Sequence, residues 1–373
     1  MKNLLRLDGW QNLITGLGKA GVDKSLNTQM ASLTITDDVQ LRNMYHNDHL
    51  AHKIIACMPQ DALSKGYVIT GLDDPEAVYD RITELKGITA LLDSLQWERL
   101  FGGCALWFGV KDGITDADSQ AQELGKLDKI LWIKVLDRRY VAPRRTSVVD
   151  DANAENYGDA QIYDLRGREP QPNGTYRTTT RGIHRSRLVL FLGHATTDDV
   201  RESREGWGLS VLEKVIASIR RNADAWAASG YMMTEASYGE LRINGLIDLI
   251  AAGQEDTVKD LVRLVNFGKS VAKTIVTDGE KQSYTVKERT FTGVPQMLNT
   301  FMLDVASAAW MPATKLFGMS AAGMNATGEG DADLWTGQVN GYRENVVSPA
   351  LRQMIDMVLL EQGIEGAEYE ITY

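Results

Sequence analysis

A helical stretch interrupted by a β-rich insertion dominates the pattern of this sequence. After residue 208 an apolar stripe recurs at helical spacing, and its members are Leu212, Val215, Ile216, Ile219, Ala223, Trp226 and Ala227. The runs ELRINGLIDLI and SVAKTIVTDGEKQSYTVKERTFTG then predict strands around a helix-like segment, DTVKDLVRLVNFG. Residues 295–316 return to a helical pattern. This order predicts an α+β fold with a small α/β excursion between two helices.

The N-terminal part of the chain predicts helices followed by strands. Residues 1–30 are polar and glycine-spotted, and we expect a flexible arm over residues 1–39. From Gln40 apolar residues follow helical spacing, and Pro59 is expected to break or restart that helix before a short strand, YVIT. A second helix is predicted over 75–101, ending at the glycine pair that starts at Gly102 and precedes a buried strand, CALWFGV.

Two further segments have clear patterns. Residues 129–193 contain short β-rich runs, with a polar loop expected at 147–160. The last predicted helix, 331–362, follows the glycine-rich stretch LFGMSAAGMNATGEGDADLW, and we expect a kink at Pro349. Its apolar positions, three or four residues apart, are Trp335, Val339, Tyr342, Val346, Ala350 and Met354.

Charge and cysteine content limit the classes of function. The formal net charge of −10 argues against a general nucleic-acid binder with a basic face, although a protein that lets DNA pass stays possible. Cys57 and Cys104 are too few and too far apart for a disulfide framework, which indicates a reducing environment. We expect no signal peptide. No run approaches the ~20 apolar residues of a membrane span, so no membrane partner is expected.

The sequence contains partial motifs for phosphate binding and for two-histidine phosphodiesterase chemistry, but their residues are not at the required positions. The tripeptide 268–270 has the ending of a phosphate-binding loop, but Arg263 stands where its first glycine belongs. His184 and His194 each begin a His-x-Ser/Thr unit, as in two-histidine phosphodiesterases. Only the predicted strand 188–192 separates them, which would place the imidazoles at opposite ends of one strand. We therefore expect no catalytic residues.

Metal motifs also fall short. His46, His49 and His52 recur every three residues around Asp48, whereas the zinc hydrolase motif has histidines four apart with glutamate beside the first. The alternating acids of GEGDAD lack the order of a calcium loop. The sequence predicts neither a metal nor a cofactor.

Several loose motifs, taken in order, resemble tailed-bacteriophage portal proteins. The run IHRSRLVLFLG…REGWGLSVLEKVIASI is similar to the family's strand and glycine–serine turn that lead into a long helix. The run FMLDVASAAWMPATKLFGMSAAGMNATGEGDADLWTGQVNGYRENVVSPALRQMI resembles its helix, turn, loop and long kinked helix. The residues of that second run that match the family's pattern are Pro312, Leu316, Gly318, Asn325, Gly328 or Glu329, Pro349 and Leu351. The likeness covers roughly 40–362, including SKGYVITG near its start.

The resemblance implies a portal-like subunit in a ring, usually dodecameric, at one capsid vertex. Placed by position, its parts are an arm (1–39), an α/β wing (40–206), stem helices (207–235 and 293–315), a clip (236–292), a tunnel loop (316–330), a kinked wing helix (331–362) and a tail (363–373). The crown is expected to be minimal or absent.

The implied partners are those of a DNA channel in the virion, assembled in the host cytoplasm. They are other copies of the chain, the major capsid or scaffold protein, the terminase large subunit, a head–tail adaptor and double-stranded DNA. The tunnel-loop residues expected to face the DNA are Met319, Met324, Asn325, Thr327, Glu329 and Asp331. Lys269 and Lys273 are expected to dock partners at the clip.

The residues of the loop are suited to weak contact with moving DNA. Its glycines and small side chains give it many conformations, and its methionines are flexible. An aspartate, Asp331 or Asp333, is expected to help cap the helix that follows. From residue 294 to 373 ten Asp and Glu side chains stand against three Lys and Arg. An acidic inner surface repels phosphate within about 10 Å at ordinary ionic strength.

Two other classes of function remain open. The portal-like subfamily that this chain resembles shares its name with an anti-CBASS phosphodiesterase, through members with an extra enzymatic region that we do not recognise here. The chain could therefore be a cytoplasmic anti-defence enzyme acting on cyclic nucleotides. It could also be another structural protein, of the capsid or of an adaptor. A ring with a central hole would support the portal, whereas phosphodiesterase activity lost on His184→Ala or His194→Ala would support the enzyme.

Overall fold

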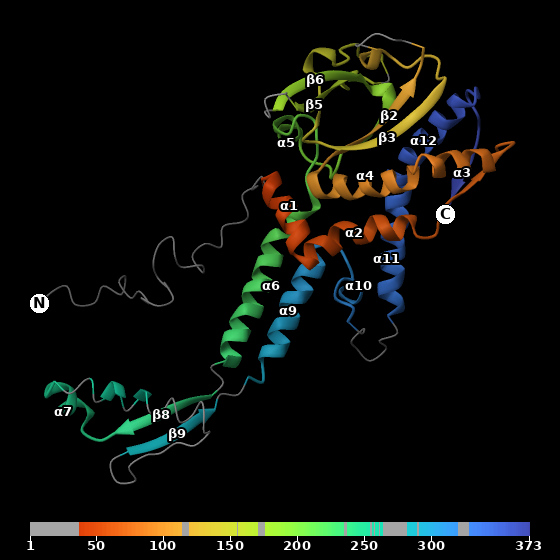
Figure 1. The fold of residues 1–373 in the computed structure, drawn as a ribbon. Helices are drawn as coiled ribbons and strands as arrows, with labels where there is room; N and C mark the ends of the chain where they lie inside the picture. Colours follow the sequence, from red (N-terminus) through yellow and green to blue (C-terminus); the bar gives the residue numbers. More distant parts are fainter. Residues whose placement is uncertain are drawn as a thin grey trace, which may run out of the picture. The chain divides into compact units, whose positions relative to one another are not determined.

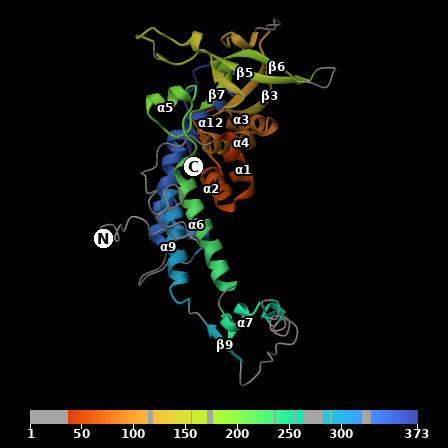
Figure 2. The same ribbon diagram turned by 90° about the vertical axis from the view of Figure 1, so that its left-hand side faces the viewer.

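The computed structural model describes most of the chain as two compact units. The described residues are 37–113, 119–154, 156–170, 176–234, 237–253, 282–288, 291–319 and 328–373, with a few positions between 256 and 263. One unit joins Met1–Val215 to Ala322–Tyr373, and the other is Ile216–Ala321. Figures 1 and 2 show the elements of both. The expected arm, 1–39, lies almost wholly outside the described residues.

The first unit combines helices with two three-stranded sheets and one two-stranded sheet. Its helices are α1 (Asp38–Asn47), α2 (His49–Leu63), α3 (Pro75–Glu84), α4 (Gly87–Phe101), α5 (Asp198–Ser203), α11 (Glu329–Tyr342) and α12 (Ser348–Glu361). Short 3₁₀ turns occur at Ser119–Ala121, Arg145–Ser147 and Arg185–Arg187. Helix α4 packs against α2, β2 and β3, and α12 packs against α3 and β7.

Antiparallel pairing joins all the strands of this unit. The strands are β1 (Val68–Thr70), β2 (Cys104–Lys111), β3 (Lys129–Asp137), β4 (Val141–Pro143), β5 (Ile162–Pro170), β6 (Tyr176–His184), β7 (Leu188–Phe191) and β10 (Glu370–Thr372). They form sheets in the orders β3-β2-β7, β4-β5-β6 and β1-β10. The predicted β-rich block 129–193 is confirmed, and the C-terminal tail forms a strand beside β1 rather than a free end.

A hydrophobic cluster contains side chains from both three-stranded sheets. Its buried members are Ala105, Val141, Ala160, Tyr163, Ile183, Leu188 and Trp207. Trp207 lies against Gly103, where a Cβ would collide with the indole ring. Ala160 belongs to this core and Val148 pairs with it as an isolated bridge, so the expected polar loop 147–160 is anchored at both ends.

Pro59 does not break its helix, contrary to the sequence prediction. Helix α2 runs through Pro59 to Leu63, and the helical break lies earlier, at Asp48, which caps α2. Proline lacks the N–H that would bond the Ile55 carbonyl. The Arg99 guanidinium supplies that donor instead, with Nε 3.2 Å from Ile55 O and Nη2 2.9 Å from Ile54 O.

The predicted helix 75–101 is also two helices. It is interrupted at Lys86, whose φ of 54° is left-handed. At the next residue, Gly87, a Cβ would lie 2.9 Å from Ile82 Cγ2 and 2.9 Å from Met354 Sδ. Close packing of α3, α4 and α12 therefore separates helices that apolar periodicity alone would join.

The long C-terminal helix changes geometry where a kink was expected. A π-helical turn at Arg343–Val347 separates α11 from α12, just ahead of Pro349. Proline removes one i→i−4 bond, which favours such a local change. At this turn Val347 is buried where the sequence pattern indicated Val346, while Ala350 and Met354 further along are buried as predicted.

The second unit contains a pair of helices and a two-stranded sheet. Helix α6 (Val211–Thr234) begins in the first unit and enters the second, which also contains β8 (Ser237–Ile243), α7 (Leu246–Ala251), β9 (Gln282–Glu288), α9 (Val294–Ala308) and α10 (Ala313–Phe317). Strands β8 and β9 pair in antiparallel register. Arg221 Nη2 and Asp304 Oδ2 form a 2.7 Å ion pair between α6 and α9, which lie side by side in both views (Figures 1 and 2).

Three sequence predictions for this unit were wrong in part. The run LIDLI is helix α7 rather than strand, because Gly245 (φ 73°) turns the chain after β8. The helix predicted over 295–316 ends at Ala308, and Trp310 takes a left-handed φ of 54° before Pro312. The apolar stripe of α6 is buried only up to Ile219, while Trp226 is 51% exposed.

Candidate functional site

The glycine-rich loop leads into a helix that begins earlier than predicted. Helix α11 starts at Glu329, with Gly328 (φ 74°) as its N-cap. The N-cap residue is therefore a glycine, with no side-chain cap hydrogen bond of its own, rather than Asp331 or Asp333 as expected. Glu329 and Asp331 instead lie in the first turn, where negative charge interacts favourably with the helix dipole.

The other predicted loop and docking residues have different outcomes. Met319 follows Gly318, the left-handed C-cap of α10, and is half-buried. The remaining expected loop contacts, Met324, Asn325 and Thr327, lie outside the described residues. So do the docking lysines, Lys269 and Lys273.

The first turns of the C-terminal helix are bonded to the end of α2. The Trp335 indole Nε1 donates to Asp61 Oδ2 at 2.7 Å. Further along the helix, Arg343 Nε donates to Ala62 O at 2.8 Å and its Nη2 to Asp61 O at 3.3 Å. A guanidinium therefore satisfies carbonyls at a helix end that have no intrahelical partner.

A buried carboxylic acid lies beside the start of the π-helical turn. Tyr342 donates its hydroxyl hydrogen to Glu98 Oε2 at 3.4 Å, and the Arg99 guanidinium lies over the Tyr342 ring. Burial raises the pKa of Glu98 to about 7, against an opposing effect of Arg99. Burial also raises the pKa of Tyr342. This environment makes the charge of Glu98 sensitive to pH near neutrality.

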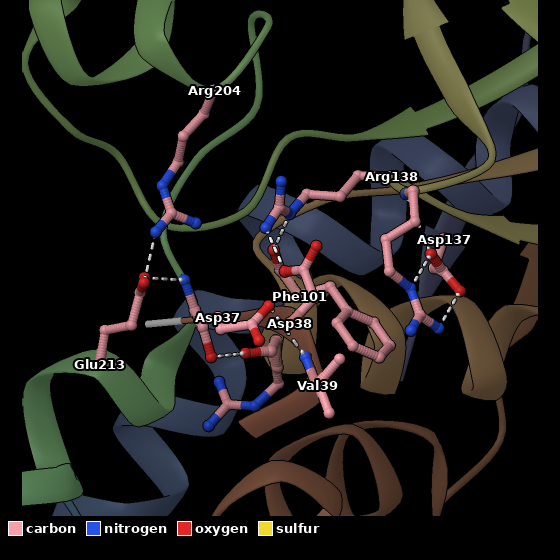
Figure 3. Close-up of polar contacts among 11 residues, drawn as sticks. Asp37, Asp38, Val39, Phe101, Asp137, Arg138, Arg204 and Glu213 are labelled. Atoms are coloured by element: carbon pink, nitrogen blue, oxygen red, sulfur yellow. Dashed lines mark hydrogen bonds and ion pairs between the residues drawn. The ribbon is translucent and has the colours of Figure 1, made fainter. Parts of the chain in front are cut away.

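The start of α6 is built around a capping box that the sequence analysis missed. Ser210 Oγ accepts from Leu212 N at 3.1 Å, and Glu213 Oε2 accepts from Ser210 N at 2.9 Å. Glu213 also pairs with Arg204, and both side chains are buried (Figure 3). The signal was present in the sequence as S-x-x-E ahead of an apolar stripe.

A second arginine, Arg138, whose side chain is partly buried, ties the N-terminal helix to the sheet beside this junction. Arg138 Nε donates to Phe101 O, and its Nη2 pairs with Asp38 in the first turn of α1 (Figure 3). Burial lowers the pKa of Arg138, and the negative charge of Asp38 partly offsets this by favouring the charged guanidinium. Glycine backbones meet here, because a Cβ at Gly102 would collide with Gly208 O. The glycine–serine turn therefore fixes the first turn of α6 within the first unit, through close backbone packing and buried charge.

The two histidines of the His-x-Ser/Thr units lie at opposite ends of β7, as predicted. His184 Nδ1 lies 2.9 Å from Ser186 Oγ and caps the 3₁₀ turn before the strand. His194, after the strand, forms a backbone bridge with Leu209. Partial burial lowers the pKa of both imidazoles. For His194, the nearby positive charges of Lys214 and Arg99 lower it further, and its pKa is about 4. His194 is therefore neutral at pH 7, and burial favours the neutral form of His184 as well.

His184 lines an open cavity in the first unit. The cavity has a volume of about 1210 Å³, and its lining includes the apolar side chains Leu188 and Leu190. Three arginines of the lining are paired with acids of the lining: Arg144 with Asp164, Arg166 with Glu205 and Arg185 with Asp159. Because these charges are paired, the three arginines do not give the cavity a basic surface.

The N-terminal histidines belong to two different helices. His46 is in the last turn of α1, while His49 and His52 are in α2, and Asp48 between them is the N-cap of α2. Among the residues that the structure describes, no three His, Cys, Asp or Glu side chains are grouped so that they could hold a metal ion. Within the same residues, no helix has both the length and the apolar character that crossing a bilayer requires.

Comparison with known families identifies the fold. A family model described as phage portal protein matches residues 39–373. The chain belongs to the phage portal protein family. Necks of gene transfer agent particles, solved with C6 and with C12 symmetry, contain chains similar to this portal-family protein at TM-scores of 0.53 and 0.52. Each match has 14% identity and covers 94% of this chain and 87% of the other.

Curated relatives are longer than this chain. A Haemophilus influenzae protein without an assigned function is 28% identical, over 96% of this chain and 78% of its own length. Proteins named anti-CBASS protein Acb1 from a Caulobacter species and Sphingomonas paeninsulae are 25% and 24% identical. Those two matches include 99% and 96% of this chain, but only 59% and 57% of the length of the two relatives.

Proposed function

We propose that this chain is the portal subunit of a phage-like particle, assembling into a ring at one capsid vertex. Family membership over residues 39–373 carries this proposal. The symmetric necks that contain similar chains support a ring, and a similar chain in the virion of a gene transfer agent supports a place in the virion. The subunit then serves as a structural component of a DNA channel rather than as an enzyme.

The second unit supplies the stem and the clip in this proposal. Helix α6 and the pair α9–α10 correspond to the stem helices expected at 207–235 and 293–315, and the β8–β9 sheet with α7 corresponds to the clip at 236–292. The clip carries eight acidic and eight basic side chains between 240 and 292, which suits docking by the terminase during packaging and by an adaptor afterwards. Lys269 and Lys273 are the proposed docking residues.

The segment 316–330 is the proposed tunnel loop. Its two described ends support this assignment, because α10 stops at the left-handed Gly318 and α11 starts at the left-handed Gly328. Glu329 and Asp331 place negative charge at the start of the helix that follows the loop. DNA that moves past an acidic surface is repelled at short range and does not adhere.

One observation keeps an enzymatic alternative in view. The relatives named anti-CBASS protein Acb1 match this chain along nearly its full length, and about two-fifths of each lies outside the match. If the shared region held an anti-defence phosphodiesterase site, His184 and His194 would be its candidates. Their separation by β7 weighs against a shared substrate phosphate, because acid and base must both reach one reacting group.

Imaging of the purified protein tests the proposed function. Negative-stain micrographs, with and without coexpressed capsid protein, are expected to show rings with a central hole. A monodisperse monomer at micromolar concentration under both conditions contradicts the portal assignment. A parallel cyclic-nucleotide hydrolysis assay decides the alternative, which requires activity that His184→Ala or His194→Ala abolishes.

A further inference from the structure

In the second unit, helix α6 buries small and polar side chains and exposes several large apolar ones. Beyond Ile219 its buried side chains are Asn222, Ala225 and Ser229, at spacings of three and four residues. Trp226 and Met233 are 51% and 64% exposed. The arrangement reverses the usual preference of a helix in a globular subunit. Large apolar side chains at helical spacing on an exposed face indicate a contact surface.

The exposed α6 face continues along the helix at regular spacing. Ala223, Trp226, Gly230 and Met233 follow at i, i+3, i+7 and i+10, and all are exposed. Such positions lie on one side of a helix. Because Ala223 and Gly230 are small, Trp226 and Met233 stand out from this side, and we call these four residues the α6 face.

Helix α9 carries a second exposed surface of low polarity. Asp304 is its only charged side chain, and this one pairs with Arg221 of α6. On the exposed side, Met297 and Leu303 are 44% and 49% exposed, with Thr300 and Ser307 beside them. We call these four residues the α9 face. An uncharged helix surface of this kind is more typical of an interface than of a solvated helix.

We propose that the α6 face of one copy docks against the α9 face of the next copy around the ring. The inference rests on the proposed portal function and names the residues of its lateral contact. A closed ring requires a heterologous contact, in which two different surfaces of each subunit meet. The α6 and α9 faces meet that requirement, because both are exposed and they belong to different helices of one ion-paired couple.

Cysteine cross-linking distinguishes this contact from other arrangements. Trp226→Cys and Leu303→Cys place thiols on the two faces, while the native Cys57 and Cys104 are buried. In a mixture of the two single variants, mild oxidation is expected to give covalent dimers. The double variant is expected to give a reducible ladder of larger species. Each single variant alone stays monomeric on denaturing gels, because a heterologous contact does not bring a face against itself.

A matched control and an assembly measurement complete the test. Asp224→Cys with Leu303→Cys is the control, since Asp224 lies two residues from Trp226 and off the α6 face. This pair is expected to give no ladder. Trp226→Glu is expected to raise the concentration for half-assembly at least tenfold, with the monomer's far-UV circular dichroism and Tm unchanged, whereas Trp226→Phe assembles as the wild type does.

The outcomes separate a failure of the proposed contact from a failure of the proposed portal function. Rings without cross-links in the mixture overturn the proposed contact and leave the portal assignment intact, with another partner covering the faces. Cross-links in either single variant indicate a two-fold contact and overturn it as well. If neither variant nor wild type forms rings, the portal function itself is contradicted.

Discussion

The Trp335 indole N–H donates a 2.7 Å hydrogen bond to the Asp61 carboxylate across 274 residues of sequence. This bond and the Arg343 contacts with Ala62 and Asp61 attach the helix that follows the proposed tunnel loop to the end of α2. The helix that begins just after the loop is therefore fixed to the N-terminal helices of its own unit.

Trp335→Phe is predicted to destabilise the fold by about 1–3 kcal/mol. The substitution removes the donor from Asp61 and leaves a smaller ring at a position that is only 8% exposed. Chemical unfolding followed by circular dichroism measures the change. Trp310→Phe is the matched control, because Trp310 is 80% exposed and its truncation is expected to change stability by less than about 0.5 kcal/mol. Equal losses for the two variants would contradict the role given to this bond.

The Arg99–Pro59 relationship predicts non-additive stability changes. Arg99→Met is expected to cost about 1–3 kcal/mol, since it leaves the Ile55 and Ile54 carbonyls without their guanidinium donor. In a Pro59→Ala background the loss is expected to be smaller, because the introduced alanine restores a backbone N–H for Ile55 O. A double-mutant cycle by urea unfolding measures the coupling. Strictly additive changes would mean that the guanidinium does not replace the missing donor.

Local pattern predicted most elements here, and tertiary contacts explain the differences. The α2 helix was predicted from its apolar spacing, but its continuation through Pro59 depends on Arg99, which belongs to α4. The break at Lys86 depends on packing between Gly87 and Met354, which no local window contains. A single stripe was read along α6, although its second half is exposed around Trp226. Periodicity identifies an apolar face without saying which surface covers it.

The candidate site was predictable only in outline. Glycine spacing located the loop and the acids after it, but the exact helix start was missed because Gly328, rather than an aspartate, is the N-cap. The capping box of Ser210 and Glu213 was readable as a motif. Its buried partner, Arg204, was not, because an arginine in a hydrophilic run gives no sign of burial.

The raised pKa of Glu98 predicts how stability depends on pH. The ordinary pKa of this carboxyl is 4.5 and the folded value is about 7. Between these values the folded state binds more protons than the unfolded state, so Glu98 lowers the free energy of unfolding as pH rises. Glu98→Gln is expected to gain stability relative to wild type from pH 4.5 to 7, by up to about 3 kcal/mol, and to hold that gain above pH 7. Unfolding curves across this range measure it, and a pH-independent difference would contradict the shift.

Charge reversal at the proposed clip is predicted to affect docking rather than assembly. Lys269→Glu with Lys273→Glu should weaken binding of the terminase large subunit, because an acidic partner surface would then be repelled. Ring formation in negative-stain images is expected to be unchanged. Lys126→Glu with Lys129→Glu is the control, since both residues belong to the other unit. A variant that no longer forms rings would assign the clip to subunit association instead.

The sign of charge beside the proposed tunnel loop is predicted to control how DNA moves. Glu329→Lys with Asp331→Lys is expected to make the channel adhesive, giving salt-sensitive DNA binding and slower packaging, because each lysine in a ring adds a phosphate contact. Lysine in the first turn of α11 also opposes the helix dipole, at about 0.3–1 kcal/mol each. Glu329→Gln with Asp331→Asn separates the two effects, since it removes the negative charge without adding a phosphate-binding group.

Deleting 321–328 shows whether the loop itself contacts DNA. A glycine-rich segment contributes little buried apolar area, so the ring is expected to form normally in the deletion variant. Packaging of DNA into capsids, or its retention there, is expected to fall, because the proposed contact with the duplex is gone. A ring that fails to assemble would instead make the segment a structural connection. An adhesive channel and a missing loop must each alter the movement of the duplex. Normal packaging in both the deletion variant and the lysine variant would therefore mean that the loop and the acidic residues after it never contact the DNA.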